Sequence, residues 1–546
     1  MSQYDDWYAM VRDFTRRLVA IRSVSPGEGE LSVAHEVLTL LHEHEAGYTE
    51  SGLDSIEHDP YGRQNAYAFL KGKSARTLVL VGHIDTVDVQ DYGTLESLAL
   101  DVEALTARRE QLGTVLEGTD VDDWLFGRGT VDMKCGVAAI VALMRHYATL
   151  AHDELPISLV MLATVDEENE SAGVLQGVRL LTRLREQYGL KYVGVINTDY
   201  TTSLYPGDPH RYIYSGTVGK LLPSFLCIGQ SSHVGAPFRG LDANLMMAEL
   251  IRRLSMNDEL CDVVRGQITA PPVTLHATDL KNHYDVQLPF AAYFYLNVLT
   301  FTTTPDMLLT RLRTYAQAAL DELLARLDTT EARWRATRGE QARTLAEHRR
   351  GIVLTYDELY AGTVQRLGRS VVGSELQHEW ERWPASLDKR ERSLYLSYKL
   401  WTLSGRNGPA ILLYYAPPYY PHVTATPGAL QDAIDAVVKH HPELFLVQEE
   451  YYPYLSDISY LRLDSGTDVS ALIANMPVWR DVEETMPISG SYNLPLDEIA
   501  QLDIPVVNFG PYGQGAHQRD EAALMSYSFG ILPQLLSEVI EQLAQQ

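Results

Sequence analysis

The sequence predicts an α/β protein built on a mostly parallel sheet flanked by helices, with a smaller α+β domain inserted into it. Strand-like and helix-like segments alternate through residues 1–210, which is typical of a layered domain with a parallel sheet. The pattern changes at about residue 211 and returns at about residue 426. The length of 546 residues also exceeds what one simple core holds, so two or three domains are expected.

The first part of the α/β domain, residues 1–210, opens with two helical patterns on either side of the turn sequence SPGEGE. Short apolar runs rich in β-forming residues follow, and helical patterns separate them. The predicted strands are residues 65–71, 77–85, 157–165 and 192–198, and the predicted helices are residues 136–150 and 174–184.

The inserted part, residues 211–425, begins as a small α+β unit and continues with an extra helical segment over about 305–425. Residues 305–350 are rich in Ala, Leu, Arg and Glu, which indicates an amphipathic helix or helix pair. The tract after residue 350 is mixed, and the tyrosines of AILLYYAPPYYPHV are interpreted as packing residues. Earlier in this part, strands are expected at residues 216–229 and 284–301 and a helix at residues 248–254.

The second part of the α/β domain, residues 426–546, completes the same pattern. IPVVNFG reads as a buried strand, and a strand-like LFLV precedes it. Helices are expected at residues 428–439 and 520–543.

Composition argues against several classes of partner. The formal charge of −27 disfavours nucleic acid and anionic membrane surfaces, which both require Lys and Arg. Three scattered cysteines are too few for a disulfide framework, and the N-terminal residues show no apolar signal region. The uncharged run at 286–305 reads as a buried strand followed by a loop. We therefore expect a soluble cytoplasmic protein without a nucleic-acid or membrane partner.

Histidines and carboxylates gather where the predicted strands end. Ligands of α/β sheets bind beyond the carboxyl ends of the strands, so these side chains are expected to share one edge of the sheet. Five segments of the chain contribute them: His83 with Asp85, Asp132, Glu167 with Glu168, Asp199, and His517.

Each of these residues also has an ordinary structural interpretation. A single His-x-Asp is commonly a surface hydrogen-bonded pair, paired glutamates are commonly solvated, and an aspartate after a strand commonly forms a turn or caps a helix. Their joint placement instead favours a site for two divalent metal ions, in which one carboxylate bridges both. Imidazole and carboxylate ligands without thiolate favour Zn²⁺, with Mn²⁺ or Co²⁺ as alternatives.

Spacing within two segments suggests a division of roles. Residues i and i+2 of a strand face the same side, so Asp85 can accept the second ring N–H of His83 and orient the ring. Neighbouring residues face opposite sides, so one of Glu167 and Glu168 is expected to bind metal and the other to act as general base. Asp88 and Asp91 are interpreted as solvated loop residues.

Together these segments resemble the M20 metallopeptidases. The resemblance lies in HID, GRGTVDMKCGVAA, TVDEENES, the aspartate of NTDY, and GAHQRDE, and it is collinear over about residues 10–300 and from 440 onward. GQSSHVGAPFRGLDAN is similar to the family's lid segment. Length and the added segment after residue 300 look most like the arginine-utilisation (RocB-type) branch. The resemblance implies a zinc-peptidase-like catalytic domain with an inserted lid and dimerisation domain.

The resemblance also implies a role for each residue. Asp132 would bridge two metal ions, and His83 with Asp199 would complete one site. Glu168 and His517 would complete the other site, with Glu167 as general base. Asp85 would orient His83, while His233 of the lid would stabilise the oxyanion in the partner's active site.

The implied reaction is hydrolysis of an amide or peptide bond in a small N-acyl amino acid or short peptide. Water held between the two metal ions would be the nucleophile, and a place in arginine or amino-acid catabolism would follow. Two alternatives stay open, namely cleavage of another C–N or ester bond on the same scaffold, and a non-catalytic metal-binding protein. A homodimer through the lid domain is implied, with a monomer as the alternative.

Substrate contacts are the least defined part of the prediction. Members of the family often carry an arginine on the lid strand, where this sequence has Asn297. Arg239 could contact substrate instead, with an ordinary surface arginine as the alternative. LSDISYL stands where a glycine-rich family segment is usual, so Asp457 and Ser459 are candidates for substrate contact or for loop capping.

Overall fold

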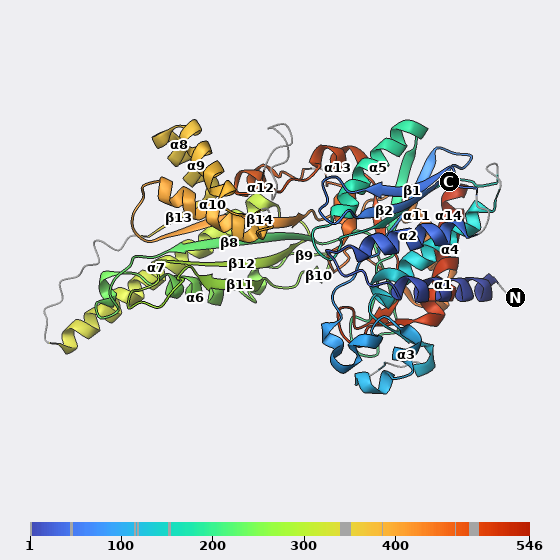
Figure 1. Ribbon diagram of the computed structural model, residues 1–546, viewed down its shortest axis with the longest axis horizontal. Helices are drawn as coiled ribbons and strands as arrows, with labels where there is room; N and C mark the ends of the chain where they lie inside the picture. The colour runs from blue at the N-terminus through green and yellow to red at the C-terminus, as the bar shows by residue number, and fades with distance from the viewer. Residues whose placement is uncertain are drawn as a thin grey trace. The chain divides into compact units, whose positions relative to one another are not determined.

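The computed structural model divides the chain into two compact units (Figure 1). Unit 1 contains Met1–Val218, Val423–Asp464 and Pro495–Gln546, and unit 2 contains Gly219–His422 and Ser465–Leu494. Residues 465–494, which the sequence pattern assigns to the α/β domain, therefore belong to unit 2. The residues that the structure describes are 3–43, 47–113, 116, 120–150, 154–338, 351–384, 386–464, 466–479 and 491–546.

Unit 1 is built on a mixed eight-stranded sheet whose centre is parallel. Its four central neighbours, β5, β3, β6 and β16, run in one direction, while antiparallel pairings occur toward both edges. The strand order is β1 (Glu50–Ser55), β2 (Gln64–Leu70), β5 (Ser158–Thr164), β3 (Arg76–His83), β6 (Lys191–Asn197), β16 (Val506–Asn508), β7 (Arg211–Tyr214) and β15 (Leu446–Glu449).

Helices cover both faces of this sheet, and the central strands are therefore continuous apolar runs. Every residue of β5 is buried. Its Met161 belongs to the main core with residues of α1, α2, α4 and α14, whereas Leu162 lies against Gly177 of α5. The helices are α1 (Gln3–Val19), α2 (Gly29–His42), α4 (Cys135–Ala148), α5 (Ala172–Tyr188), α11 (Ala429–His440) and α14 (Leu532–Gln545).

A small second sheet of unit 1 joins distant parts of the chain. Its strand order is β17 (Gly513–Gln514), β18 (Ala522–Leu524) and β4 (Trp124–Phe126), all paired antiparallel. The segment expected to form one closing helix thus begins with β18, and α14 starts only at Leu532. The hairpin of β17 and β18 holds the loop that contains His517.

Unit 2 is a five-stranded sheet with helices on both sides (Figure 1). The tyrosine-rich tract forms the strand β14, in which Tyr414 and Tyr415 are fully buried. The long helix α7 ends at Thr337, and residues 339–350 of the expected helical segment lie outside the described residues. The strand order is β11 (Val273–Asp279), β12 (Ala291–Thr300), β8 (Gly219–Ile228), β14 (Ala410–Tyr420) and β13 (Ile352–Thr355). The described α-helices of unit 2 are α6 (Ala243–Leu254), α7 (Pro305–Thr337), α8 (Tyr356–Leu367), α9 (Arg369–Glu381), α10 (Lys389–Leu403) and α12 (Ser470–Ala474).

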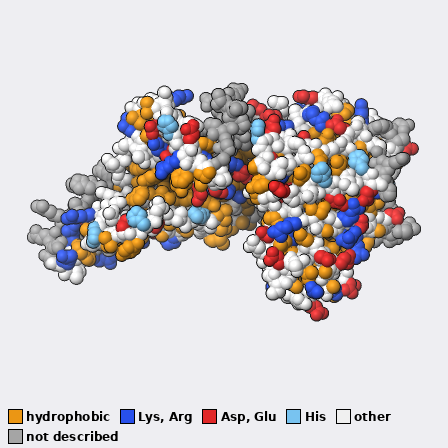
Figure 2. Space-filling model, viewed as in Figure 1, with side chains coloured by type: hydrophobic (Ala, Val, Ile, Leu, Met, Phe, Trp, Pro, Cys, Tyr) orange, Lys and Arg blue, Asp and Glu red, His pale blue; other side chains and the backbone are white. Residues whose placement is uncertain are grey.

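Surface features agree with the mixed composition of the chain. On the face shown in Figure 2, acidic and basic side chains are interspersed over both units. Among the described residues, no helix combines the length and the apolar character needed to cross a bilayer.

Close packing of α4 against the sheet depends on a glycine. A Cβ added at Gly136 would lie 2.1 Å from the carbonyl oxygen of Thr198, in the segment that follows β6. A glycine at this position therefore lets the start of α4 approach the sheet edge at which Asp199 lies.

We expect Gly136→Ala to destabilise unit 1 by about 1–3 kcal/mol, because the added methyl group must displace backbone atoms. The matched control is Gly373→Ala in α9, where an added Cβ meets no atom within 4 Å. This control should be neutral or stabilising by roughly 0.5–1 kcal/mol, since alanine has the better helix propensity. Thermal and urea unfolding of both variants would measure the difference, and equal effects would contradict the packing argument.

Candidate metal centre

Three neighbouring parallel strands deliver predicted site residues to one edge of the unit 1 sheet. His83 is the last residue of β3. Glu167 and Glu168 follow the end of β5, and Asp199 follows the end of β6. Because β5, β3 and β6 are adjacent and parallel, their carboxyl ends meet at the same edge.

Two further residues reach this edge from outside the large sheet. Asp132 lies in the turn Thr130–Lys134 between β4 and α4, where its φ of −113° and ψ of 93° depart from helical values. The peptide bond between Asp132 and Met133 is cis. His517 lies in the loop of the β17–β18 hairpin with a φ of 62°.

The oxygens of Asp132 face two different histidines. His83 Nε2 lies 3.0 Å from Asp132 Oδ1, and His517 Nε2 lies 3.1 Å from Asp132 Oδ2. His517 Nε2 also lies 2.9 Å from Glu168 Oε1. One carboxylate thus lies between two imidazoles that come from distant segments of the chain.

Potential ligand atoms form three overlapping groups, each with all its atoms within 4.8 Å of one another. Asp132 belongs to two of these groups, and Glu167 belongs to the third. The groups are His83, Asp132 and Asp199; Asp132, Glu168 and His517; and His83, Glu167 and Glu168.

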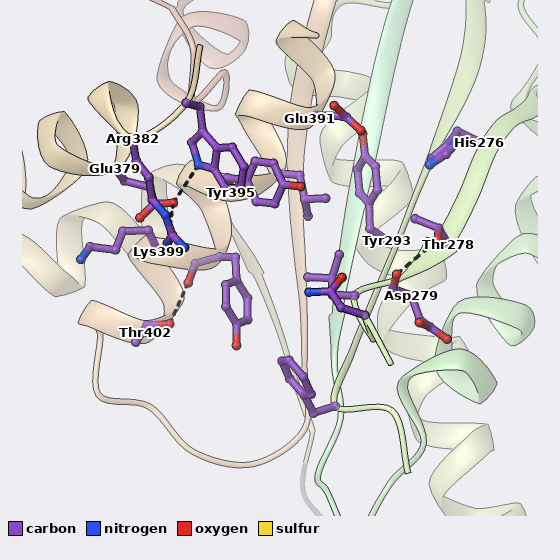
Figure 3. Close-up of a pocket in the computed structure, with 16 residues that line it drawn as sticks. His276, Thr278, Asp279, Tyr293, Glu379, Arg382, Glu391, Tyr395, Lys399 and Thr402 are labelled. Carbon is purple, nitrogen blue, oxygen red and sulfur yellow. Dashed lines mark hydrogen bonds and ion pairs between the residues drawn. The ribbon is translucent and has the colours of Figure 1, made fainter. Parts of the chain in front are cut away.

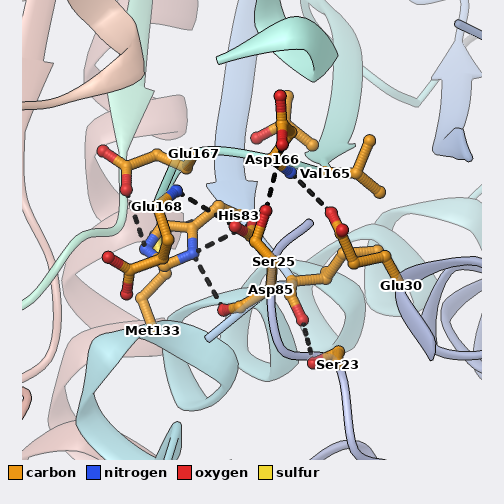
Figure 4. A network of polar contacts seen from close by, with 12 residues as sticks. Ser23, Ser25, Glu30, His83, Asp85, Met133, Val165, Asp166, Glu167 and Glu168 are labelled. Carbon is orange, nitrogen blue, oxygen red and sulfur yellow. Dashed lines mark hydrogen bonds and ion pairs between the residues drawn. The ribbon is translucent and has the colours of Figure 1, made fainter. Parts of the chain in front are cut away.

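Asp85 contacts both His83 and the segment that carries Glu168 (Figure 4). His83 Nδ1 lies 3.2 Å from the Asp85 backbone carbonyl and 3.6 Å from its carboxylate oxygen Oδ1. The other carboxylate oxygen accepts the backbone N–H of Glu168 at 3.0 Å. Asp85 therefore links the β3 end to the turn after β5, and its backbone carbonyl is the nearer partner of the imidazole ring.

The centre contains more buried negative charge than nearby cations of the chain neutralise. Among the described residues, the recorded ion pairs of these carboxylates are with the two histidines, and none is with Lys or Arg. Burial raises the pKa of Asp199 to about 8, and the nearby carboxylate of Asp132 adds to the shift. Burial likewise raises the pKa of Glu167 well above its usual range. Divalent cations would offset this excess, and the nitrogen and oxygen ligands suit them.

A buried arginine outside the cluster holds the Glu167–Glu168 turn. Arg63 is only 5% exposed and forms ion pairs with Glu30, Asp59 and Asp166. Glu30 also accepts the backbone N–H of Asp166 at 2.7 Å, as Figure 4 shows. Sequence reasoning missed Arg63, since nothing in the local pattern distinguishes it from a surface arginine.

Asp88 and Asp91 are open to solvent, as predicted, but each also pairs with an arginine. Both lie at least partly open to solvent and outside the candidate metal-binding groups. However, Asp88 pairs with Arg22, and both oxygens of Asp91 accept from Arg128 Nη2 at 2.8 Å. Each aspartate therefore has a partner within the fold.

The predicted substrate-contact residues are divided between the units. Asp457 is buried in unit 1, where it accepts the hydroxyl of Thr164 at 3.0 Å. Ser459 is also buried in unit 1. Asn297 is half-buried on β12 of unit 2, and Arg239 is exposed on unit 2.

His233 is exposed on unit 2, where a local contact fixes its tautomer. Its Nδ1 accepts the backbone N–H of Gly235 at 3.0 Å. The proton of the neutral ring therefore resides on Nε2, which is left as a donor.

Unit 2 also contains a cavity of about 520 Å³ between helices α9 and α10 and strands β11 and β12 of the sheet (Figure 3). Its walls include Tyr293, Tyr395 and Trp383, and the last two rings are stacked with centroids 4.2 Å apart. Glu379 accepts the indole N–H of Trp383 at 3.0 Å. None of the predicted site residues lines this cavity.

The fold and the histidine–carboxylate cluster define a class, the metal-dependent hydrolases built on an α/β sheet. The chain belongs to peptidase family M20/M25/M40, whose family model matches residues 79–463. This match confirms the predicted family and the predicted class of enzyme. The protein is thus a metallopeptidase or amidohydrolase that cleaves peptide or acyl–amino-acid bonds.

Two curated relatives span nearly the whole chain. The chain is 30% identical to Protein RocB of Bacillus subtilis, over 98% of this chain and 95% of that protein. It is 32% identical to the uncharacterized protein YqjN of the same organism, over 97% of this chain and 95% of that protein. These relations confirm the predicted RocB-type branch.

The fold is also that of solved M20 structures. The aminopeptidase PepT from Bacillus cereus superposes with a TM-score of 0.53 at 11% identity, covering 98% of this chain and 99% of that chain. This likeness confirms the predicted fold class of a sheet-based catalytic domain with an inserted lid domain.

We expect Arg63→Met to destabilise unit 1 by about 3–5 kcal/mol, because it leaves buried carboxylates without their cation. The control is Arg183→Met, which removes a 44% exposed partner of Glu50 and should cost no more than about 1 kcal/mol. Urea unfolding in the presence of a chelator would compare the variants without a contribution from bound metal. Similar losses in both variants would show that Arg63 does not hold the turn.

Proposed function

We propose that this protein is a di-metal amidohydrolase in which Asp132 bridges the two metal ions. His83 and Asp199 would hold one ion, and Glu168 and His517 the other. The observation that carries the proposal is the position of Asp132, whose two oxygens face histidines from distant segments at 3.0 and 3.1 Å. Zn²⁺ fits the imidazole and carboxylate ligands best, with Mn²⁺ or Co²⁺ as alternatives.

The metal ions would supply Lewis-acid polarisation of the scissile carbonyl and lower the pKa of attacking water. Glu167 is assigned as the general base. Its side chain is only 11% exposed, and its carboxylate lies 4.0 Å from His83 Nε2, beside both candidate ligand groups. In this position Glu167 would take a proton from water and transfer it to the leaving nitrogen. Asp85 would hold the imidazole of His83 in the metal-binding orientation.

His233 is assigned as the donor to the oxyanion. The contact between its Nδ1 and Gly235 leaves Nε2–H free to donate, as this role requires. Unit 2 would supply this residue either to the same chain or to a partner. The exposed edge strand β11, with Val273 and Leu275 42% and 53% exposed, supports a homodimer through unit 2. Light scattering during size-exclusion chromatography would distinguish a dimer from a monomer.

The proposed substrate is a small N-acyl amino acid or short peptide. The relation to RocB supports a role in arginine or amino-acid catabolism. All three cysteines are free thiols, which supports a site of action in the reducing cytoplasm. Asn297, Arg239, Asp457 and Ser459 stay candidates for substrate contact.

An activity screen tests the proposed function directly. The purified protein, loaded with zinc, manganese or cobalt, should hydrolyse at least one member of a panel of N-acyl amino acids and dipeptides. The panel includes acylated arginine and ornithine, with matched esters to detect the alternative chemistry. A protein that binds none of these metals would overturn the metallohydrolase proposal.

Glu167→Gln should reduce turnover by at least 10²-fold while both metal ions stay bound, because the amide cannot take the proton. Elemental analysis would verify the metal content beside the kinetic assay. The control is Glu57→Gln, which alters a surface glutamate paired with Arg179 and should leave kcat unchanged. Full activity in Glu167→Gln would refute the assigned base.

His233→Ala should lower kcat by roughly 10²–10³-fold, the usual loss for one oxyanion donor, without changing metal content. His283→Ala is the matched control, since it removes another exposed histidine of unit 2. If His233→Ala instead raised KM alone, His233 would act in substrate binding and not on the oxyanion.

A further inference from the structure

A buried arginine joins several segments around the candidate metal centre. Arg128 is 1% exposed, and its guanidinium Nη1 donates to Glu521 Oε2 at 2.8 Å. Its Nη2 donates to both oxygens of Asp91 at 2.8 Å, and its Nε donates to the backbone carbonyl of Asp88 at 3.2 Å. Arg128 thus connects the loop after His83 with the C-terminal part of unit 1.

Glu521 extends this connection to the backbone of Asp132. Its second carboxylate oxygen, Oε1, accepts the backbone N–H groups of Val131 and Asp132, both at 3.3 Å. The Glu521 side chain is fully buried. Its backbone carbonyl also accepts the N–H of Gly127 at 3.1 Å, beside the pairing of β18 with β4.

The same glutamate closes the loop that carries His517. Glu521 lies four residues after His517, and its backbone N–H donates to the carbonyl of Gln518 at 3.1 Å. One residue therefore contacts the Asp132 turn through its side chain and ends the His517 loop through its backbone. A shift of Glu521 would move both segments.

Because Arg128 and Glu521 are both buried, each side chain needs the other as the partner of its charge. A carboxylate with no solvent exposure is costly without a cation, and Arg128 is its recorded ion-pair partner among the described residues. Removal of Arg128 would leave Glu521 buried beside the acidic metal centre. The expected relief is a movement of Glu521, and with it a movement of Asp132 and His517.

We propose that Arg128 and Glu521 are positioning residues. They keep the carboxylate of Asp132 and the imidazole of His517 in the positions needed to bind the metal ion of the Glu168–His517 site, called the second ion below. The proposal rests on the di-metal function proposed above. Neither side chain is assigned to metal or substrate. Arg128 acts through Glu521, and Glu521 acts through the backbone of the Asp132 turn and the His517 loop.

The two metal sites should depend on this pair unequally. His83 and Asp199 are held at the ends of adjacent sheet strands, β3 and β6. His517 belongs to a hairpin loop that the large sheet does not contain, and it contacts Asp132 Oδ2 and Glu168 Oε1. Loss of the Arg128–Glu521 pair should therefore weaken the site of Glu168 and His517 more than the site of His83 and Asp199.

Calorimetric titration of the metal-free full-length protein with Zn²⁺ tests this inference. The wild-type protein is expected to bind two ions. Arg128→Met should bind the first ion with an affinity close to wild type and the second with an affinity about 10–100-fold weaker. Arg128→Lys should recover part of the loss, because it restores the charge but not the forked geometry. Co²⁺ absorption spectra, taken at one and two equivalents, provide a second readout independent of activity.

Glu521→Gln is the second variant, since it keeps the size and the acceptor oxygen but removes the charge that pairs with Arg128. It should show the same selective loss of the second ion, and it decides the question if Arg128→Met does not fold. The matched control is Arg392→Met in unit 2, which removes an equally buried arginine that donates to backbone carbonyls of Trp380 and Pro384. This control should bind both ions with wild-type affinity.

Two results would overturn the inference. If the folded Arg128→Met and Glu521→Gln proteins bind both ions as tightly as wild type, the pair does not position the centre. If these variants lose both ions to the same extent, their role is general stabilisation of unit 1. A wild-type protein that binds no Zn²⁺ would instead refute the di-metal function on which the inference depends.

Discussion

The central constraint in this protein is the concentration of buried carboxylates at one edge of the unit 1 sheet. The buried Asp132 and Asp199 lie together with the partly buried Glu167 and Glu168, and Asp85 contacts the same segments. Wherever one of these carboxylates has a recorded ionic partner among the described residues, that partner is His83 or His517. Such a cluster costs free energy in proportion to its burial unless cations neutralise it. The surrounding fold must therefore hold these groups at fixed positions despite their mutual repulsion.

Among the described residues, buried cations of the chain contact residues next to the cluster and not the clustered carboxylates themselves. Arg63 neutralises the carboxylates beneath the Glu167–Glu168 turn, and Arg128 neutralises Glu521 behind the Asp132 turn. Lys134 is fully buried as well, and its ammonium group donates to the backbone carbonyls of Leu18 and Ile21 near the end of α1. These cations hold the backbone that carries the proposed ligands without forming recorded ion pairs with the ligands' own carboxylates, an arrangement typical of residues that support a metal site.

The juxtaposition of the candidate ligands could be predicted because it follows a topological rule. His83 and Asp199 lie at the ends of apolar runs, so the predicted strands alone indicate that both residues lie at the carboxyl-end edge of the sheet. Arg63 and Arg128 could not be identified in the same way, since burial of an arginine depends on long-range packing that local sequence does not encode. The strand β14 was not predicted because its prolines and tyrosines obscure the strand pattern. The assignment of Ser465–Leu494 to unit 2 was also missed, since this segment is separated in sequence from Gly219–His422, the rest of unit 2.

The proposed ligands are all confined to one of the two units. Every proposed metal ligand belongs to unit 1, whereas the added helices α8, α9 and α10 belong to unit 2. An insertion in unit 2 therefore leaves the strand ends and the β17–β18 hairpin intact. The superposition with PepT at 11% identity agrees with this view, because a sheet edge depends on strand order and apolar burial more than on particular side chains.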